Sequence, residues 1–174
     1  ERGIPIHIGH SAANVTDDIA FVIRTAAVHD DNPEVHEAHR RGIPVFERTQ
    51  AWGALMRGYP NALCISGTHG KTTTTSMSTH IMMAAEKDPT VMIGGTLPLL
   101  HACHRVGKGN TIIMESCEYY NSFLSLNPTI AVILNIEADH LDFFKDIEDI
   151  KHSFRLFAER VPAETGTVIA NCDD

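Results

Sequence analysis

The sequence has few cysteines, and none of them form a recognisable metal-binding or redox pair. No two occur in a C-x-x-C pattern, because the four lie far apart: Cys64, Cys103, Cys117 and Cys172. This spacing argues against a dithiol redox site, so we expect reduced thiols in a cytoplasmic protein. Two histidine pairs, His36 with His39 and His101 with His104, have helical spacing but lack the further ligands that a zinc site needs. We interpret these histidines as surface residues.

The sequence also lacks a long apolar run and a surplus of positive charge. No apolar stretch approaches the roughly 20 residues that cross a bilayer, and residues 1–5 do not resemble a signal peptide. The net charge of −8 with neutral histidines argues against a nonspecific nucleic-acid surface. A length of 174 residues then suits one domain, or one domain with a piece of another.

Apolar strand-like segments alternate with helical segments along the chain. Strands are expected at Ile4–Ile8, Ile19–Arg24, Pro44–Phe46, Ala62–Ser66, Thr111–Glu115, Thr129–Asn135 and Thr167–Asn171. Helices are expected at Pro33–Arg41, Gln50–Arg57, Thr73–Ala85 and Ile147–Arg160. Most of the strand segments are continuous β-branched runs, which is typical of strands buried on both faces. The alternation predicts an α/β fold with mostly parallel sheets and flanking helices.

A domain boundary is expected at Met56–Asn61, where Gly58 and Pro60 interrupt the pattern. The part before it holds too few elements for a complete doubly wound domain. At the other end, Gly166–Asn171 reads as a new strand with only three residues after it. We therefore expect the sequence to be a fragment of a longer enzyme.

A phosphate-binding loop is the most informative motif. The strand-like Ala62–Ser66 leads into Gly67-Thr68-His69-Gly70-Lys71-Thr72 and then into a helical tract. Glycines allow backbone N–H groups to point inward, the helix N-terminus favours an anion, and lysine and threonine suit phosphates and Mg²⁺. The motif is a short variant, since Ile65 stands where the standard pattern has glycine. The alternative is an ordinary strand-to-helix turn with a solvated lysine.

Two further strand ends carry polar residues. Glu115 ends the run Thr111–Met114, and Asn135–Asp142 follows the run Ile130–Leu134. Ligands of open parallel sheets bind at the carboxyl ends of strands, so Glu115 is a candidate magnesium ligand. The alternative for Glu115 is a hydrogen-bonded surface carboxylate. His140, taken alone, suits a capping or supporting role better, because Mg²⁺ prefers oxygen ligands.

Taken together, residues 67–75, 115–124 and 135–142 resemble the Mur ligase family. The resemblance implies a three-domain enzyme of which this sequence holds a part. Residues 1–58 would be the later part of a Rossmann-like UDP-sugar-binding domain, and residues 59–174 the first part of a central P-loop ATPase domain. The C-terminal amino-acid-binding domain would be absent.

The resemblance also implies an activity and site residues. It implies ATP-dependent amide formation through an acyl phosphate, with UDP-N-acetylmuramate and L-alanine as substrates, in peptidoglycan precursor synthesis. Lys71 and His140 would be catalytic, and Asn135 would contact the γ-phosphate or the substrate carboxylate. Mg²⁺ would be bound by Thr72, Glu115 and His140. ATP would be bound by Gly67, Thr68, His69, Gly70, Lys71, Thr72 and Thr73.

Some positions depart from the commoner family pattern. Ser116-Cys117 stands in place of Ala-Asp, and Tyr120 in place of aspartate. Sister ligases that add later residues carry a carbamylated lysine where this sequence has Phe154 and Arg155, which favours the alanine-adding branch. Four alternatives remain open here: another Mur-type ligase, a folylpolyglutamate-type ligase, a P-loop phosphotransferase, or a nucleotide-binding module without catalysis.

Overall fold

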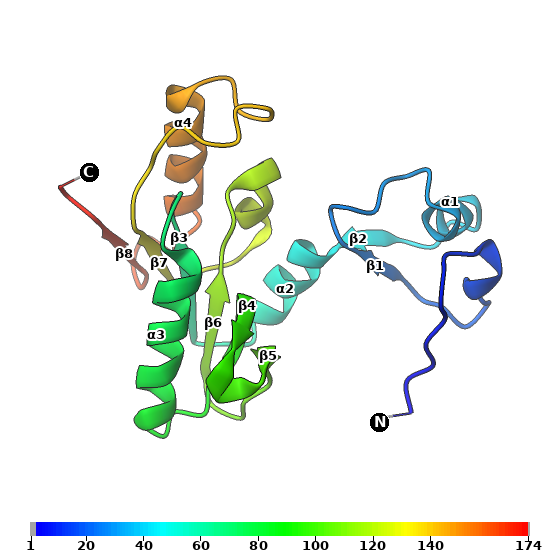
Figure 1. The fold of residues 1–174 in the computed structure, drawn as a ribbon, viewed down its shortest axis with the longest axis horizontal. Helices are drawn as coiled ribbons and strands as arrows, with labels where there is room; N and C mark the ends of the chain where they lie inside the picture. Colours follow the sequence, from blue (N-terminus) through cyan, green and yellow to red (C-terminus); the bar gives the residue numbers. More distant parts are fainter. Residues whose placement is uncertain (1–2, 174) are drawn as a thin grey trace. The chain divides into compact units, whose positions relative to one another are not determined.

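The computed structural model describes residues 3–173 and divides into two compact units, with the division between Ala51 and Trp52. Figure 1 shows the elements of both units along the chain. Each unit is described by itself below. Among the described residues, no helix has both the length and the apolar character needed to cross a membrane.

The N-terminal unit contains a two-stranded parallel sheet and one complete α-helix. Its elements are η1 (Ala12–Asn14), β1 (Val22–Arg24), α1 (Pro33–Arg40) and β2 (Val45–Glu47), and α2 (Arg48–Met56) begins at its end. Helix α1 starts as the sequence predicts, because the Asn32 side chain accepts a hydrogen bond from the Glu34 N–H at 3.0 Å and Pro33 occupies the first turn.

The expected strand Ile4–Ile8 is wrong: this segment forms no strand. Strand β1 pairs with β2, and no described strand lies beside Ile4–Ile8 to complete a hydrogen-bonded ladder. Its isoleucine side chains are accordingly exposed. An apolar run becomes a stable strand only where neighbouring strands and a packed face are available.

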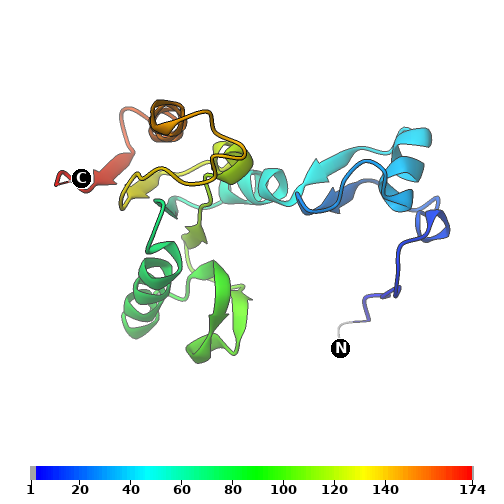
Figure 2. The ribbon, with the colours of Figure 1, turned by 45° about the horizontal axis from the view of Figure 1, so that its top comes forward.

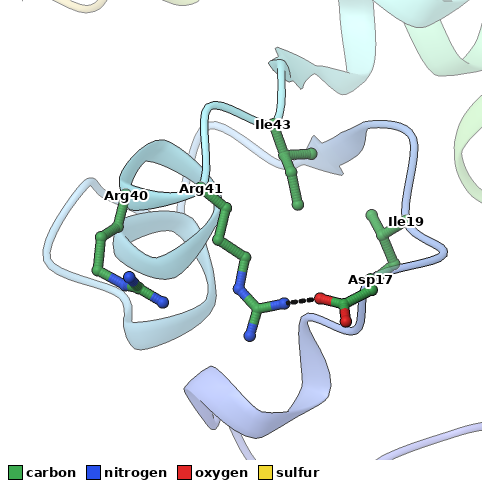
Figure 3. A pocket seen from close by; sticks show the side chains of 5 residues that line it. All are labelled: Asp17, Ile19, Arg40, Arg41 and Ile43. Atoms are coloured by element: carbon green, nitrogen blue, oxygen red, sulfur yellow. Dashed lines mark hydrogen bonds and ion pairs between the residues drawn. The ribbon is translucent and has the colours of Figure 1, made fainter.

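The N-terminal unit also has a hollow of about 520 Å³, whose lining is shown in Figure 3: Asp17, Ile19, Arg40, Arg41 and Ile43. Its positive charges are already paired. Arg41 donates to Asp17 at 2.8 Å and to Glu37 at 2.6 Å, and Arg40 also donates to Glu37. The hydrogen bonds from Arg40 and Arg41 lower the pKa of Glu37 to about 2. We assign no ligand to this hollow.

The C-terminal unit is built around a six-stranded, mostly parallel sheet, which confirms the predicted fold class. The strand order is β5-β4-β6-β3-β7-β8, and only β5 is antiparallel to its neighbour. The strands are β3 (Asn61–Ser66), β4 (Thr90–Leu97), β5 (Ala102–Arg105), β6 (Thr111–Glu115), β7 (Ile130–Ile133) and β8 (Thr167–Ala170). Because β3 lies between β6 and β7, the carboxyl ends of these three strands are neighbours.

Helices cover both faces of this sheet, with α3 (Lys71–Ala84) on one face and α4 (Ile147–Ala158) on the other (Figure 2). Side chains alternate between two cores: Cys64 belongs to the cluster under α4, and the next residue, Ile65, to the cluster on the α3 side. Under α4, the ring of Phe123 stacks on Phe157 with centroids 4.5 Å apart. Burial on both faces explains the continuous apolar runs in the sequence.

The pair β4 and β5 was not expected from the sequence. Strand β4 starts with Thr90-Val91-Met92-Ile93, but Gly94-Gly95 then interrupts the apolar pattern. Its strand structure depends on pairing with β6, where Val91 lies opposite Ile113. Two 3₁₀ segments complete the unit, η2 (Pro98–Leu100) and η3 (Tyr119–Ser125).

Candidate functional site at three strand ends

The loop after β3 has the backbone of an anion-binding cradle. Gly67 and Gly70 have φ angles of 140° and 82°, which residues other than glycine rarely adopt. A Cβ atom on Gly67 would lie 3.0 Å from the Cβ of Leu134. Gly70 is the N-cap of α3 and offers no side-chain cap, so the first N–H groups of this helix are available for a ligand.

The loop is held in place by the segment that follows β7. Asn135 accepts a hydrogen bond from the His69 N–H at 2.8 Å and donates to the His69 carbonyl at 3.1 Å. The Thr68 hydroxyl accepts from the Glu137 N–H at 2.8 Å. The side-chain amide of Asn135 therefore positions the loop here, and its contact with phosphate or substrate stays a prediction.

Lys71 lies in the first turn of α3, and its ammonium group has a full set of acceptors. It donates to the carbonyls of Gly67 at 2.6 Å and Thr68 at 3.1 Å, and to a Glu118 carboxylate oxygen at 3.0 Å. Glu118 is 2% exposed. A charge buried to this extent needs a partner, and Lys71 supplies it. A phosphate group that binds Lys71 must replace at least one of these acceptors.

Thr72 and Glu115 lie together beside the loop. The Thr72 hydroxyl donates to Glu115 Oε1 at 2.8 Å, and the Gly94 N–H donates to Oε2 at 2.7 Å. Within the described residues, no three His, Cys, Asp or Glu side chains group as a ready metal site. One hydroxyl and one carboxylate nevertheless fit Mg²⁺, which takes its remaining ligands from water and substrate phosphates.

His140 lies in the loop after β7, close to Glu118. Its Nε2 is 3.9 Å from Glu118 Oε1 and 4.0 Å from an Asp139 carboxylate oxygen. Its φ of 52° lies in the left-handed region. Glu118 thus lies within 4 Å of both Lys71 and His140.

Comparison with known protein families identifies the family of the chain. The sequence profile of the Mur ligase middle domain matches residues 65–174, and that of the Mur ligase family catalytic domain matches residues 1–60. The chain belongs to the Mur ligase family. Its resemblance in residues 67–75, 115–124 and 135–142 is thereby confirmed.

Named Mur ligases are similar to the chain over nearly its whole length. A UDP-N-acetylmuramate–L-alanine ligase from Lachnospira eligens is 52% identical over 98% of this chain and 37% of that protein. The crystal structure of a UDP-N-acetylmuramate–alanine ligase from Thermotoga maritima has a TM-score of 0.83 and 31% identity, covering 99% of this chain and 39% of that one. The chain therefore spans well under half the length of these relatives.

A third Mur ligase shares the fold. The structure of UDP-N-acetylmuramate:L-alanyl-γ-D-glutamyl-meso-diaminopimelate ligase from Neisseria meningitides has a TM-score of 0.85 at 24% identity, over 97% of this chain and 57% of that one. At this identity the likeness shows the fold alone.

Two residues of this Mur ligase site were not assigned from the sequence. Glu118 belongs to the motif around Glu115, but its burial against Lys71 depends on the order of β6 and β3 in the sheet. Gly94 belongs to a strand that was not expected, and its N–H binds Glu115. The signal for Gly94 was the β-branched run Thr90–Ile93 just before the glycine pair.

Proposed function

We propose that the chain is part of an ATP-dependent ligase that joins L-alanine to the carboxylate of UDP-N-acetylmuramate, in cytoplasmic synthesis of peptidoglycan precursors. One observation carries the proposal. Thr72, which follows Lys71 in the first turn of α3, donates a hydrogen bond to Glu115 at the end of the strand beside β3. The names and similarity of the relatives support the choice of substrates. We further propose that residues 1–58 belong to the UDP-sugar-binding domain and residues 59–174 to the ATPase domain.

The chemistry requires activation of a carboxylate, because its oxygen is a poor leaving group. The substrate carboxylate attacks the γ-phosphorus of ATP, the bond to the β-γ bridging oxygen breaks, and ADP leaves. The amine of alanine then attacks the acyl phosphate, loses a proton and displaces inorganic phosphate. Catalysis of this kind is mainly positioning and charge neutralisation.

The residues of the loop have distinct roles in this proposal. The backbone of residues 67–73, with the side chains of Thr68, His69 and Thr73 around it, would cradle the phosphates. Lys71 would move from its loop carbonyls to the β- and γ-phosphate oxygens and offset their charge. Thr72 and Glu115 would hold a first Mg²⁺, and His140 would help to hold a second. Bound Mg²⁺ would neutralise phosphate charge.

The branch assignment is supported by the position of Phe154. This side chain is 1% exposed and packs edge-on against Phe123, with ring centroids 5.2 Å apart. It occupies a position that the resemblance associates with the carbamylated lysine of later ligases. A core phenylalanine supplies no oxygen ligand, which favours the alanine-adding branch.

Substrate assays on the full-length ligase would test this function. With UDP-N-acetylmuramate, ATP and single amino acids, we expect mass spectrometry to find the L-alanine amide together with ADP and phosphate. Carboxylate labelled with ¹⁸O should pass one labelled oxygen to the released phosphate. A product made only with a peptide, or a phosphorylated product without an amide, would contradict the proposal. Residues 1–174 alone should form no amide.

Substitution of Gly94 by alanine should weaken magnesium binding. Its added Cβ would lie 2.5 Å from Glu115 Oε1, so the carboxylate must leave the position in which it accepts the hydrogen bond from Thr72. We expect the apparent affinity of the full-length ligase for Mg²⁺ to fall about tenfold or more, measured from the Mg²⁺ dependence of ADP release. Gly95→Ala is the matched control, because its Cβ would meet only Thr72 Cγ2 at 3.7 Å. Equal Mg²⁺ dependence of the two variants would refute the role of Gly94.

A further inference from the structure

The ring of Tyr119 lies flat against the imidazole of His140. Their centroids are 4.3 Å apart and their planes differ by 22°. Tyr119 follows β6 at the start of η3, whereas His140 follows β7. The stack therefore joins two loops that are distant in sequence and that both border the phosphate loop.

Tyr119 is itself fixed from three sides. Its hydroxyl donates a hydrogen bond to the carboxylate of Asp142, two residues beyond His140. Phe143 meets the ring edge-on, with centroids 6.1 Å apart, and Tyr120 lies at 4.3 Å. The phenol is therefore a fixed surface for the imidazole.

The imidazole of His140 has little else to orient it. Within the described residues its ring nitrogens make no hydrogen bond, since the carboxylates of Glu118 and Asp139 lie 3.9 and 4.0 Å from Nε2. Its backbone has the left-handed φ of 52°, as do Tyr120 at 53° and Asn121 at 55°. Such conformations persist where surrounding contacts determine them, and they cluster at functional sites.

We infer that Tyr119 is a positioning residue that fixes the imidazole of His140 beside Glu118 and so sets the affinity for the metal ion bound there. The inference rests on the proposed role of His140 as a metal ligand. A histidine ligand normally has its ring plane fixed by a hydrogen bond to its second nitrogen, and loss of that support typically weakens metal binding 10–100-fold. Here the ring of Tyr119, held by the hydrogen bond from its hydroxyl to Asp142, fixes the ring plane of His140 by stacking.

The test uses Mn²⁺ in place of Mg²⁺ and measures binding rather than turnover. Electron paramagnetic resonance would count Mn²⁺ bound to the full-length ligase with a nonhydrolysable ATP analogue. We expect two ions for the unchanged protein and one for His140→Ala. Tyr119→Ala should weaken only the second ion, by about 10–100-fold. Tyr119→Phe keeps the stack but loses the bond to Asp142, so its loss should be smaller.

Tyr120→Ala is the matched control. Tyr120 is an equally large aromatic residue that contacts Tyr119 and Phe143, with no ring contact to His140. Because Tyr120 is only one of the contacts around Tyr119, we expect Tyr120→Ala to keep the stack on His140 and to weaken the second ion far less than Tyr119→Ala does. An equal loss in the two variants would overturn the inference. Thermal unfolding of each variant would show whether it is folded, and nucleotide binding whether the loop is intact.

The outcomes separate the inference from the function on which it rests. Two tightly bound ions in Tyr119→Ala, with one in His140→Ala, would overturn the inference and leave the function standing. Two ions in His140→Ala would overturn the metal role of His140 and the inference with it. Parallel loss of both ions, nucleotide binding and stability in both Tyr119 variants would show a merely structural residue and also overturn the inference.

Discussion

Replacement of Lys71 by alanine should lower kcat of the full-length ligase about hundredfold or more. Its ammonium group is the cation that the phosphate loop holds, in the first turn of α3 and within 3.1 Å of two loop carbonyls. Preorganised charges at a transferring phosphoryl group typically contribute this much to the rate. The measurement is steady-state ADP release with saturating UDP-N-acetylmuramate and L-alanine.

The same substitution also leaves Glu118 without its partner, so stability must be separated from catalysis. Breaking a buried ion pair from one side typically costs about 3–5 kcal/mol. The double variant Lys71→Ala/Glu118→Gln removes both charges and should recover most of the lost thermal stability. It should not recover activity, because the cation is still missing. Near-normal turnover in either variant would show that Lys71 does not serve the phosphates.

Replacement of Glu115 by glutamine should have the second large effect, a loss of Mg²⁺ affinity of at least about a hundredfold. The carboxylate lies 2.8 Å from the Thr72 hydroxyl and is oriented by the Gly94 N–H. An amide keeps the shape and one oxygen but removes the negative charge that attracts the cation. Loss of a direct ligand should exceed the 10–100-fold that loss of a supporting residue typically causes.

Titration of activity with Mg²⁺ gives the measurement, and excess Mg²⁺ should restore part of the rate. Glu137→Gln is the matched control: this carboxylate also borders the loop, but it is exposed and lies 3.6 Å from His69 rather than beside Thr72. It should leave the Mg²⁺ dependence unchanged. If Glu115→Gln behaved like Glu137→Gln, Glu115 would be an ordinary hydrogen-bonded surface carboxylate.

Much of the fold follows from local patterns. Strand β6 has the predicted bounds Thr111–Glu115, and α4 begins at the predicted Ile147, where Asp146 accepts a hydrogen bond from the Asp149 N–H. These elements carry their own signals: a continuous β-branched run and a capped amphipathic helix. Strand β4 had only the short run Thr90–Ile93 before its glycine pair, and β5 had no such signal. The apolar Ile4–Ile8 had a signal but no neighbouring strand to pair with. In both cases the presence or absence of a neighbouring strand decided whether the segment formed a strand.

The candidate site divides in the same way. The spacing of glycines, lysine and threonine in residues 67–72 predicted the loop, because backbone freedom and charge are properties of neighbouring residues. The loop motif and the strand end also suggested Thr72 and Glu115 as magnesium ligands, but their 2.8 Å contact comes from the adjacency of β3 and β6. No local pattern marked Glu118, whose burial depends on two strands and two loops.

The sequence by itself determined the phosphate loop, the alternation of strands and helices, and membership of the Mur ligase family. Each of these depends on residues close together in the chain or on motifs in a fixed order. The tertiary structure alone decided that Glu118 lies within 4 Å of both Lys71 and His140, that Gly94 supports Glu115, and that Tyr119 stacks on His140. These contacts join segments 21–47 residues apart, and only the packing of parallel strands brings such segments to one edge of a sheet.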